Sequence, residues 1–286
     1  MTTAYEIIKV TCSDNYDLTA RFYPAQTEEA LAPILICPAT GITTNFYHSF
    51  AVWLAEQGHP VMSFDFRGIG GSLYGKLKDS KASIQDWGQL DIPAMIDALI
   101  KKTGAEQIKM IGHSAGGQLL GIVPNHDKVS RLVSIAGSTG HVKDLKGRTK
   151  LLAPVMFNLI FPIARYTIGY GPTSKIGMGE DLPKDVAKQW AQFCSKPGYV
   201  ANAIGKTIFD DYHAEVKTPI TVLRASDDEI ASEANVKDLL RLYPNTPTNI
   251  IEVKPSEYNH SSIGHMMMFK KSHQNIWSLI LTQINH

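Results

Sequence analysis

The chain has 286 residues, which is long enough for one α/β domain with an insertion and for a sizeable buried core. Its hydrophobic share of 44% and charged share of 19% are ordinary values for a globular protein. A formal net charge of +1 leaves no electrostatic footprint for nucleic acid, and no run of like charges suggests an interaction tail. Composition therefore argues against nucleic acid as a partner and favours a compact globular domain.

The cysteines and the amino terminus bear on localisation. Cys12, Cys37 and Cys194 are scattered without metal-ligand spacing, and their odd number argues against a disulfide framework. A reducing compartment is the default for such a chain. Residues 1–6 contain neither a basic region nor an apolar core, so we expect no secretory signal there. We predict a cytoplasmic location, no cofactor and no metal.

The first predicted elements form the edge of a sheet. Short alternating stretches at 5–11 and 18–23, separated by turn residues at 13–15, predict an antiparallel hairpin. A continuous apolar run at 33–37 is typical of a strand that is buried on both faces of a parallel sheet. A helix at about 45–57 and a buried strand at 61–64 complete a predicted βαβ unit.

Helices and buried strands continue to alternate along the rest of the chain. Helices are predicted at 91–101, 233–241 and 276–284, and strands at 106–111, 129–136, 219–224 and 248–253. In the first of these helices the apolar side chains recur on one face. This alternation implies a doubly wound, mostly parallel sheet.

The alternation breaks after residue 136 for roughly eighty residues, which indicates an insertion on the sheet. We therefore expect a core domain made of residues 1–137 and 215–286, with a cap at 138–214. The most apolar window, 151–164, contains two prolines and is shorter than the ~20 residues that span a bilayer. We interpret it as a cap helix that packs on the body, with an acyl-binding or interfacial surface as the alternative. A second cap helix is predicted at 184–194.

One motif organises the chain, the G-x-S-x-G sequence at Gly112–Gly116, with Ser114 at its centre. The residues before it resemble a strand, and the residues at 118–123 resemble the opening of a helix, which is the context of a nucleophile elbow. Such a sharp turn strains the serine backbone, and glycines are needed where the two elements crowd together.

The stretch Gly112–Gly117, with the sequence G-H-S-A-G-G, resembles the elbow of α/β-hydrolases, and in particular of their serine aminopeptidase, monoacylglycerol lipase and esterase branch. The resemblance covers residues near 30–136 and 219–284, while the cap matches no family that we can name. It implies an α/β-hydrolase fold, with a mostly parallel doubly wound sheet and a helical cap insertion. It also implies that His113 supports the elbow and takes no part in catalysis.

In that fold an acid and then a base follow the serine along the chain. The run 225–232 resembles the segment of the family that carries the triad acid, and its alignment favours Asp228. Asp227 is interpreted as an N-cap or turn carboxylate. Gly264 and His265 match the Gly-His pair of the family, so we expect His265 to be the base. His260 is the nearest rival, interpreted as a solvated loop residue.

Acyl transfer passes through an oxyanion that needs two preorganised donors. One expected donor is the backbone N–H of Ala115, the residue after the nucleophile. The other is the N–H of Thr40, because Pro38–Gly41 occupies the place of the His-Gly-x-x segment of the family. Since the His-Gly pair is missing here, the second donor can shift by one residue, and a role for the Thr40 hydroxyl stays open.

A glycine-rich stretch at 64–72 resembles the Asp-x-Arg-Gly-x-Gly-x-Ser loop of the family, which is structural there. A dinucleotide fingerprint would require glycine at the position of Leu73. A P-loop would require serine or threonine at the position of Leu77. We therefore interpret this stretch as structural.

These residues predict a serine hydrolase that cleaves a carboxylic ester, or a thioester, through an acyl-enzyme on Ser114 with His265 and Asp228. The expected partner is a small-molecule acyl ester, with no transmembrane segment and with interfacial lipid contact through the cap as an open alternative. An acyltransferase with the same triad and a non-catalytic binding module with a hydrolase fold are the other two hypotheses. The sequence leaves the oligomeric state open.

Overall fold

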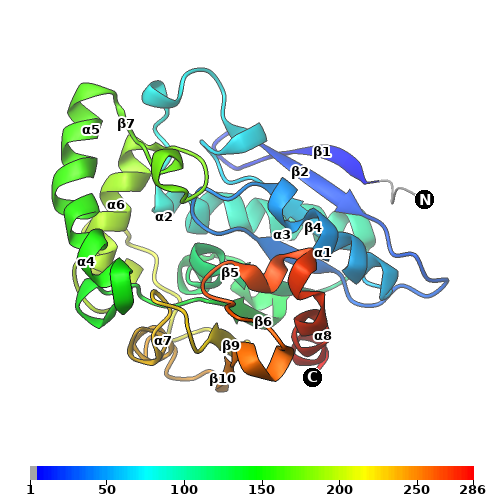
Figure 1. The fold of residues 1–286 in the computed structure, drawn as a ribbon. Helices are drawn as coiled ribbons and strands as arrows, with labels where there is room; N and C mark the ends of the chain where they lie inside the picture. The colour runs from blue at the N-terminus through cyan, green and yellow to red at the C-terminus, as the bar shows by residue number, and fades with distance from the viewer. Residues whose placement is uncertain (1–4) are drawn as a thin grey trace.

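The computed structural model describes residues 5–286, so residues 1–4 of the stretch that we examined for a secretory signal lie outside the described residues. Most strands build one eight-stranded sheet, with the order β1-β2-β4-β3-β5-β6-β9-β10 (Figure 1). These strands are β1 (Glu6–Thr11), β2 (Asp17–Tyr23), β3 (Ile34–Cys37), β4 (Val61–Phe64), β5 (Ile108–His113), β6 (Val129–Ile135), β9 (Ile220–Ala225) and β10 (Thr248–Val253).

The sheet is antiparallel only at the edge where the chain begins. β1 pairs with β2 and β2 pairs with β4 in antiparallel fashion, whereas the pairings from β4 through β10 are parallel. The predicted amino-terminal hairpin and the predicted βαβ unit around β3 and β4 are therefore confirmed. Because the parallel strands run the same way, their carboxyl ends meet at one edge of the sheet.

Helices cover both faces of the sheet and create two hydrophobic cores. One core contains residues of α1 (Thr44–Glu56) and α8 (Trp277–Asn285), and the other contains residues of α3 (Ile92–Thr103) and α7 (Glu233–Leu240). A short helix, α2 (Ile84–Asp86), precedes α3. In β3, Ile34 and Ile36 enter the first core while Leu35 and Cys37 enter the second. Both faces of this strand are buried, which explains its continuous apolar run.

The segment after β5 differs from the prediction, because the expected helix at 118–123 is absent. Two 3-10 turns, Ser114–Gly117 and Leu120–Ile122, take its place. Gly121 bonds through its N–H to the Tyr243 hydroxyl at 3.1 Å and accepts at its carbonyl from the Tyr212 N–H at 2.8 Å. Its backbone groups are thus satisfied without helical bonds, and Pro124 biases the preceding residue away from helical geometry.

The inserted segment forms a helical layer at one end of the sheet, on the left in Figure 1. α4 (Gly147–Val155) runs through a π-helical turn at Met156–Ile160 into α5 (Phe161–Thr167), and α6 (Lys184–Cys194) packs beside them. A small hairpin, β7 (Tyr170–Gly171) with β8 (Leu182–Pro183), joins α5 to α6. The limits of the cap, 138–214, stay a prediction. Within the described residues, every helix is too short or too polar to cross a bilayer.

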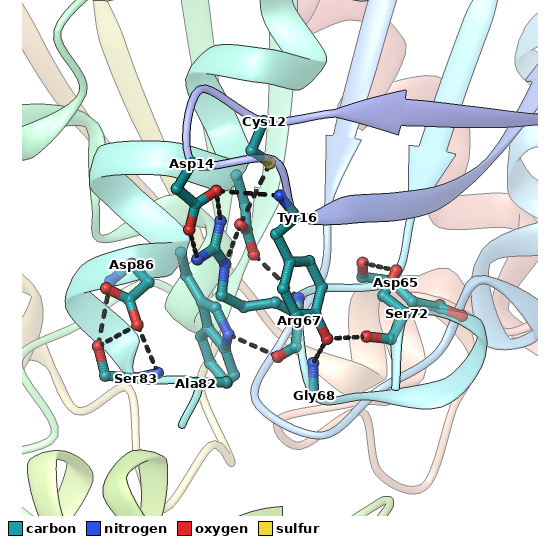
Figure 2. A network of polar contacts seen from close by, with 12 residues as sticks. Cys12, Asp14, Tyr16, Asp65, Arg67, Gly68, Ser72, Ala82, Ser83 and Asp86 are labelled. Carbon is teal, nitrogen blue, oxygen red and sulfur yellow. Dashed lines mark hydrogen bonds and ion pairs between the residues drawn. The ribbon is translucent and has the colours of Figure 1, made fainter. Parts of the chain in front are cut away.

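The glycine-rich loop after β4 is held by a buried polar network (Figure 2). The Arg67 guanidinium bonds to Asp91 at 2.5 Å and to Asp14 of the hairpin turn at 2.7 Å. Asp65 accepts from the N–H of Thr44 at 2.7 Å, which ties the loop to the start of α1. The network therefore joins the sheet edge, α1 and the turn before α3, and its contacts are those of a structural loop.

Candidate active site

Ser114 lies where β5 ends, in a backbone conformation that is unusual for a residue with a side chain. Its φ angle is +46°, in the left-handed region. A Cβ atom on Gly112 would overlap the backbone of Gly117, and one on Gly116 would overlap the Cys37 carbonyl. Both the strain at the serine and the need for its flanking glycines are therefore as predicted.

In the structure, two hydrogen bonds in series connect Ser114 to His265 and His265 to Asp228. The His265 Nε2 atom lies 3.0 Å from the Ser114 hydroxyl oxygen, and its Nδ1 atom lies 2.8 Å from an Asp228 carboxylate oxygen. Asp228 follows β9 as Ser114 follows β5, so both come from the carboxyl ends of parallel strands. A hydroxyl, an imidazole and a carboxylate in this order can transfer a proton away from the serine.

The surroundings of Asp228 keep its carboxylate charged although the side chain is buried. Burial acts to raise the pKa of Asp228, but the adjacent His265 imidazole and the N–H groups of Ile230 and Ala231 outweigh it, so the pKa lies below its ordinary value. The two N–H groups donate to the carboxylate at 2.8 and 2.9 Å. Asp228 can therefore hold the His265 ring in one orientation at neutral pH.

Asp227 has a different contact from the one that we predicted. It accepts from the Ser262 hydroxyl at 2.7 Å and from the N–H groups of Ile263 and Gly264 at 3.0 Å each. The N-cap of α7 is instead Ser232. The N-cap alternative for Asp227 was wrong, whereas the residue does lie in the turn after β9, with its side chain toward the loop that carries His265. Asp227 thereby holds that loop next to Asp228.

Glu229, the third carboxylate of this run, was not singled out from the sequence. It accepts from the Thr149 N–H at 2.8 Å and from the Thr149 hydroxyl at 2.7 Å, and it also accepts from the Arg148 N–H at 3.2 Å. The start of α4 is thus attached to the loop of Asp228. A carboxylate at a helix start satisfies free N–H groups and complements the helix dipole.

The two expected oxyanion donors lie on adjacent loops. Thr40 follows β3 and Ala115 follows β5, and these strands are neighbours that pair as far as Cys37 and Gly112. Within residues 5–286, the backbone N–H groups of Thr40 and Ala115 donate neither to a side chain nor to another backbone segment. The Gly116 N–H donates to the Pro38 carbonyl at 3.1 Å and ties the two loops together.

Within residues 5–286, neither His113 nor His260 bonds to the Ser114 hydroxyl. His113 is buried, and burial lowers its pKa to about 3, so its ring is neutral. His260 bonds through Nε2 to the Asn275 side chain at 2.8 Å, away from Ser114. In the described part of the chain, no three His, Cys, Asp or Glu side chains gather in a way that could hold a metal ion.

Comparison with known proteins finds likenesses to proteins named as hydrolases. The family model described as alpha/beta hydrolase fold matches residues 32–160. Lipase lipl-1 of Caenorhabditis elegans is 31% identical over 164 residues, which cover 53% of this chain and 38% of the relative. Lipase 3 of Drosophila melanogaster is 25% identical over 169 residues, which cover 52% of this chain and 43% of the relative. The chain thus spans less than half the length of these two curated relatives.

Solved structures resemble nearly the whole chain. A soluble variant of monoglyceride lipase from Saccharomyces cerevisiae, in complex with a substrate analog, has a TM-score of 0.70 at 15% identity, covering 99% of this chain and 96% of that one. An esterase from Pyrococcus furiosus has a TM-score of 0.60 at 15% identity, covering 99% of this chain and 93% of that one. These likenesses confirm the predicted fold class.

Proposed function

The chain has the α/β-hydrolase fold and is similar to esterases and lipases, and from this premise we propose that it hydrolyses carboxylic esters through an acyl-enzyme on Ser114. The proposal rests on two hydrogen bonds in series. His265 Nε2 lies 3.0 Å from the Ser114 hydroxyl oxygen, and His265 Nδ1 lies 2.8 Å from the Asp228 carboxylate. The partial match to relatives that are named lipases supports the same reaction class.

In the proposed mechanism, the Ser114 oxygen attacks the ester carbonyl carbon while His265 takes the hydroxyl proton at Nε2. The carbonyl oxygen becomes an oxyanion, which accepts hydrogen bonds from the backbone N–H groups of Ala115 and Thr40. When the tetrahedral intermediate collapses, the ester C–O bond breaks and His265 gives its proton to the leaving alcohol. Water then repeats the sequence on the acyl-enzyme, releasing the acid and restoring Ser114.

Two variants test this proposal with a matched control. His265→Ala and Ser114→Ala are compared with His260→Ala, which removes a histidine from the same loop but not from the path to Ser114. With p-nitrophenyl esters of increasing acyl length, the first two variants are expected to lose roughly 10⁴-fold or more in kcat, while the control stays within about twofold. Equal rates in His265→Ala and the control would contradict the assignment.

The substrate class is suggested by the long cap helix formed by α4, the π-helical turn and α5. One face of this helix exposes large apolar side chains, with Leu151 74% exposed and Tyr166 89% exposed. The side chains on this exposed apolar face are Leu151, Leu152, Val155, Leu159, Ile163 and Tyr166. The opposite face is buried, and there Phe157 packs against Trp190 of α6 with ring centroids 5.4 Å apart. The helix therefore exposes an apolar face to solvent in addition to the apolar face that it buries.

Charge along residues 145–179 favours an anionic lipid surface as the partner of the exposed apolar face. Residues 145–179 contain basic side chains and no aspartate or glutamate. The basic residues are Lys146, Arg148, Lys150, Arg165 and Lys175. Apolar insertion together with attraction to anionic headgroups is how interfacial helices bind membranes. We therefore propose that the enzyme takes its esters from a lipid surface.

Co-sedimentation with vesicles tests the lipid contact. The double variant Leu159→Ser with Ile163→Ser is compared with Leu31→Ser, which changes an exposed leucine far from the cap in the sequence. We expect the double variant to lose binding to phosphatidylglycerol vesicles by roughly a thousandfold, with Leu31→Ser unchanged, because about six side-chain carbons are withdrawn from the lipid at ~0.8 kcal/mol for each buried CH₂. Equal binding by both variants would contradict the assignment of this face.

We also propose a reducing, cytoplasmic compartment, which is supported by the cysteines. Cys12, Cys37 and Cys194 are all free and buried. Buried thiols act as small apolar side chains, and they need no oxidising environment. Fractionation of cells that express the chain should recover it with a cytosolic marker, and recovery in the medium would contradict the proposal.

A further inference from the structure

Tyr47 of α1 is fully buried where three loops of the candidate site meet. Its hydroxyl oxygen accepts a hydrogen bond from the Ala39 N–H at 2.9 Å. The same oxygen lies 2.8 Å from Nδ1 of His113, and Nε2 of His113 lies 3.0 Å from the backbone carbonyl oxygen of His265. These bonds connect three separate stretches of the chain, at 39–47, 113 and 265.

The directions of these bonds determine where the protons lie. The His265 carbonyl can only accept, so Nε2 of His113 must carry a hydrogen and donate it. A neutral imidazole then has Nδ1 without a hydrogen, which makes Nδ1 an acceptor for the Tyr47 O–H. The Ala39 N–H donates to a lone pair of the Tyr47 oxygen, so the Tyr47 hydroxyl hydrogen is free to point at Nδ1 of His113. Burial lowers the pKa of His113 to about 3, which is consistent with a neutral ring. The donor and the acceptor of each of the three hydrogen bonds are therefore fixed.

Each end of this path lies next to an atom that takes part in the proposed reaction. Ala39 directly precedes Thr40, His113 directly precedes Ser114, and His265 is the proposed base itself. We propose that Tyr47 and His113 are positioning residues, which set the places of the second oxyanion donor, the nucleophile and the base relative to one another. This inference rests on the proposed function of Ser114 and His265.

A simple packing role is the competing explanation, because Tyr47 also belongs to an aromatic cluster. Its ring lies edge-on to those of Phe46 and Phe269, with centroids 5.1 and 5.0 Å apart. Packing needs only the ring, whereas positioning needs the hydroxyl. The Tyr47→Phe variant separates the two roles because it keeps the ring and removes one oxygen.

The chain offers a matched control in Tyr23 of β2. Tyr23 is also fully buried, and its hydroxyl lies 3.1 Å from Nδ1 of His48. Tyr23→Phe therefore removes a part-buried tyrosine-histidine hydrogen bond that does not lead to the triad. Each variant leaves a histidine nitrogen without its partner, on the buried His113 or on the half-buried His48, so both variants lose stability and Tyr47→Phe loses more.

The experiment measures kcat, KM and the rate of fluorophosphonate labelling for the wild type and both variants. We expect Tyr47→Phe to lower kcat and the labelling rate by roughly tenfold to a hundredfold, with KM within about twofold, because small displacements of reacting groups cost that much. Tyr23→Phe should stay within about twofold of the wild type. Equal rates in the two variants would overturn the positioning role. If Tyr47→Phe does not fold, His113→Gln breaks the path at its middle and is measured in its place.

A second readout does not depend on turnover. His265 Nδ1 lies 2.8 Å from Asp228, and we expect the proton between them to give a downfield NMR resonance whose position reports the geometry of that bond. We expect this resonance to shift in Tyr47→Phe but not in Tyr23→Phe. A wild type that hydrolyses no ester would overturn the proposed function, while an unchanged resonance in Tyr47→Phe would overturn the positioning role.

Discussion

The loops around Ser114 are held by buried hydrogen bonds, whereas the long cap helix beside them exposes apolar side chains to solvent. Both regions lie over the carboxyl ends of the parallel strands, but they are built from different interactions. Buried polar paths specify one geometry, because each unpaired group is costly. An exposed apolar face specifies no partner within the chain. Under the proposed function, the loops supply the chemistry and the cap selects the substrate.

Two contacts join the inserted segment to the loops that carry Asp228 and Thr40. Glu229, next to Asp228, accepts from the first turn of α4, and the Glu180 N–H donates to the Gly41 carbonyl at 2.7 Å. Gly41 follows Thr40, the proposed second oxyanion donor. The cap is thus attached at one end to residues 226–232, which we call the acid loop after the proposed role of Asp228, and at the other to residues 38–43, which we call the oxyanion loop after the proposed role of Thr40. A displacement of the cap would act on both loops of the proposed site.

The largest effect is expected from the two neighbouring carboxylates of the acid loop. Asp228→Asn should lower kcat for a soluble ester by roughly 10⁴-fold, because an amide cannot hold His265 in the tautomer that accepts the serine proton. Asp227→Asn only loosens the loop of His265, and roughly tenfold is expected. Steady-state kinetics of both variants check this order, and a larger loss in Asp227→Asn would reverse the assignment of the acid.

The next largest effect concerns the buried ion pair behind the site. Arg67→Met leaves the buried Asp91 carboxylate without its counter-charge, and we expect a loss of about 3–5 kcal/mol in the free energy of unfolding. Lys102→Met breaks an exposed ion pair with Glu6 of β1. This variant should lower the free energy of unfolding by less than about 1 kcal/mol. Urea unfolding at pH 7 measures both, and similar losses in the two variants would contradict the structural role of the loop.

The neutral ring of His113 predicts how stability depends on pH. Burial lowers the pKa of His113 to about 3, so the folded chain excludes a proton that the unfolded chain binds below about pH 6.5. From that pH down to about 3, this residue therefore makes the free energy of unfolding fall by up to about 1.4 kcal/mol per pH unit. In His113→Gln the fall between pH 7 and 5 should be shallower. His260→Gln, a change in a loop histidine, should keep the wild-type dependence, and identical curves for all three proteins would refute the prediction.

A smaller effect is expected where the cap meets the acid loop. Glu229→Ala removes the acceptor for the first turn of α4 and should cost about 1 kcal/mol, as the loss of a helix cap does. Glu233→Ala changes an exposed residue in the first turn of α7 and serves as the control, with a change of at most about 0.5 kcal/mol expected. Denaturant titrations distinguish the two, and no difference would show that Glu229 does not hold the cap.

The smallest effect belongs to the exposed apolar face of the cap. Leu159→Ser should change the free energy of unfolding by no more than about 0.5 kcal/mol and leave hydrolysis of a soluble short-chain ester within about twofold. Phe161→Ala, on the buried face of the same helix, should cost about 3–5 kcal/mol. Thermal unfolding and kinetics of the two variants test this contrast. A large loss in Leu159→Ser would mean that this face is covered in the folded protein.

Local patterns predicted much of the fold. The strands at 61–64 and 248–253 and the helix at 184–194 begin and end where the sequence indicated, because apolar runs and helical spacing are local signals. The helix expected after Ser114 is absent because Gly121 finds partners in Tyr212 and Tyr243, far along the chain. Tertiary contacts of this kind leave no mark on the local pattern.

The candidate site, like the fold, could be predicted from the sequence only in part. Ser114, Asp228 and His265 were expected from a motif, the chain order and short resemblances, and the structure brings them together. The contacts of Asp227 and Glu229 were not foreseen, because each depends on which loop the side chain faces. The path through Tyr47 joins positions 39, 47, 113 and 265, and no spacing in the sequence indicates it.

The most direct test of the account is intact-mass analysis after treatment with a fluorophosphonate probe. The wild type should gain the mass of one adduct, and both Ser114→Ala and His265→Ala should gain none over the same time, because the serine needs its base to react. An adduct that persists in Ser114→Ala would place the reactive residue elsewhere. No adduct on the folded wild type would contradict an activated serine and leave the fold without the proposed chemistry.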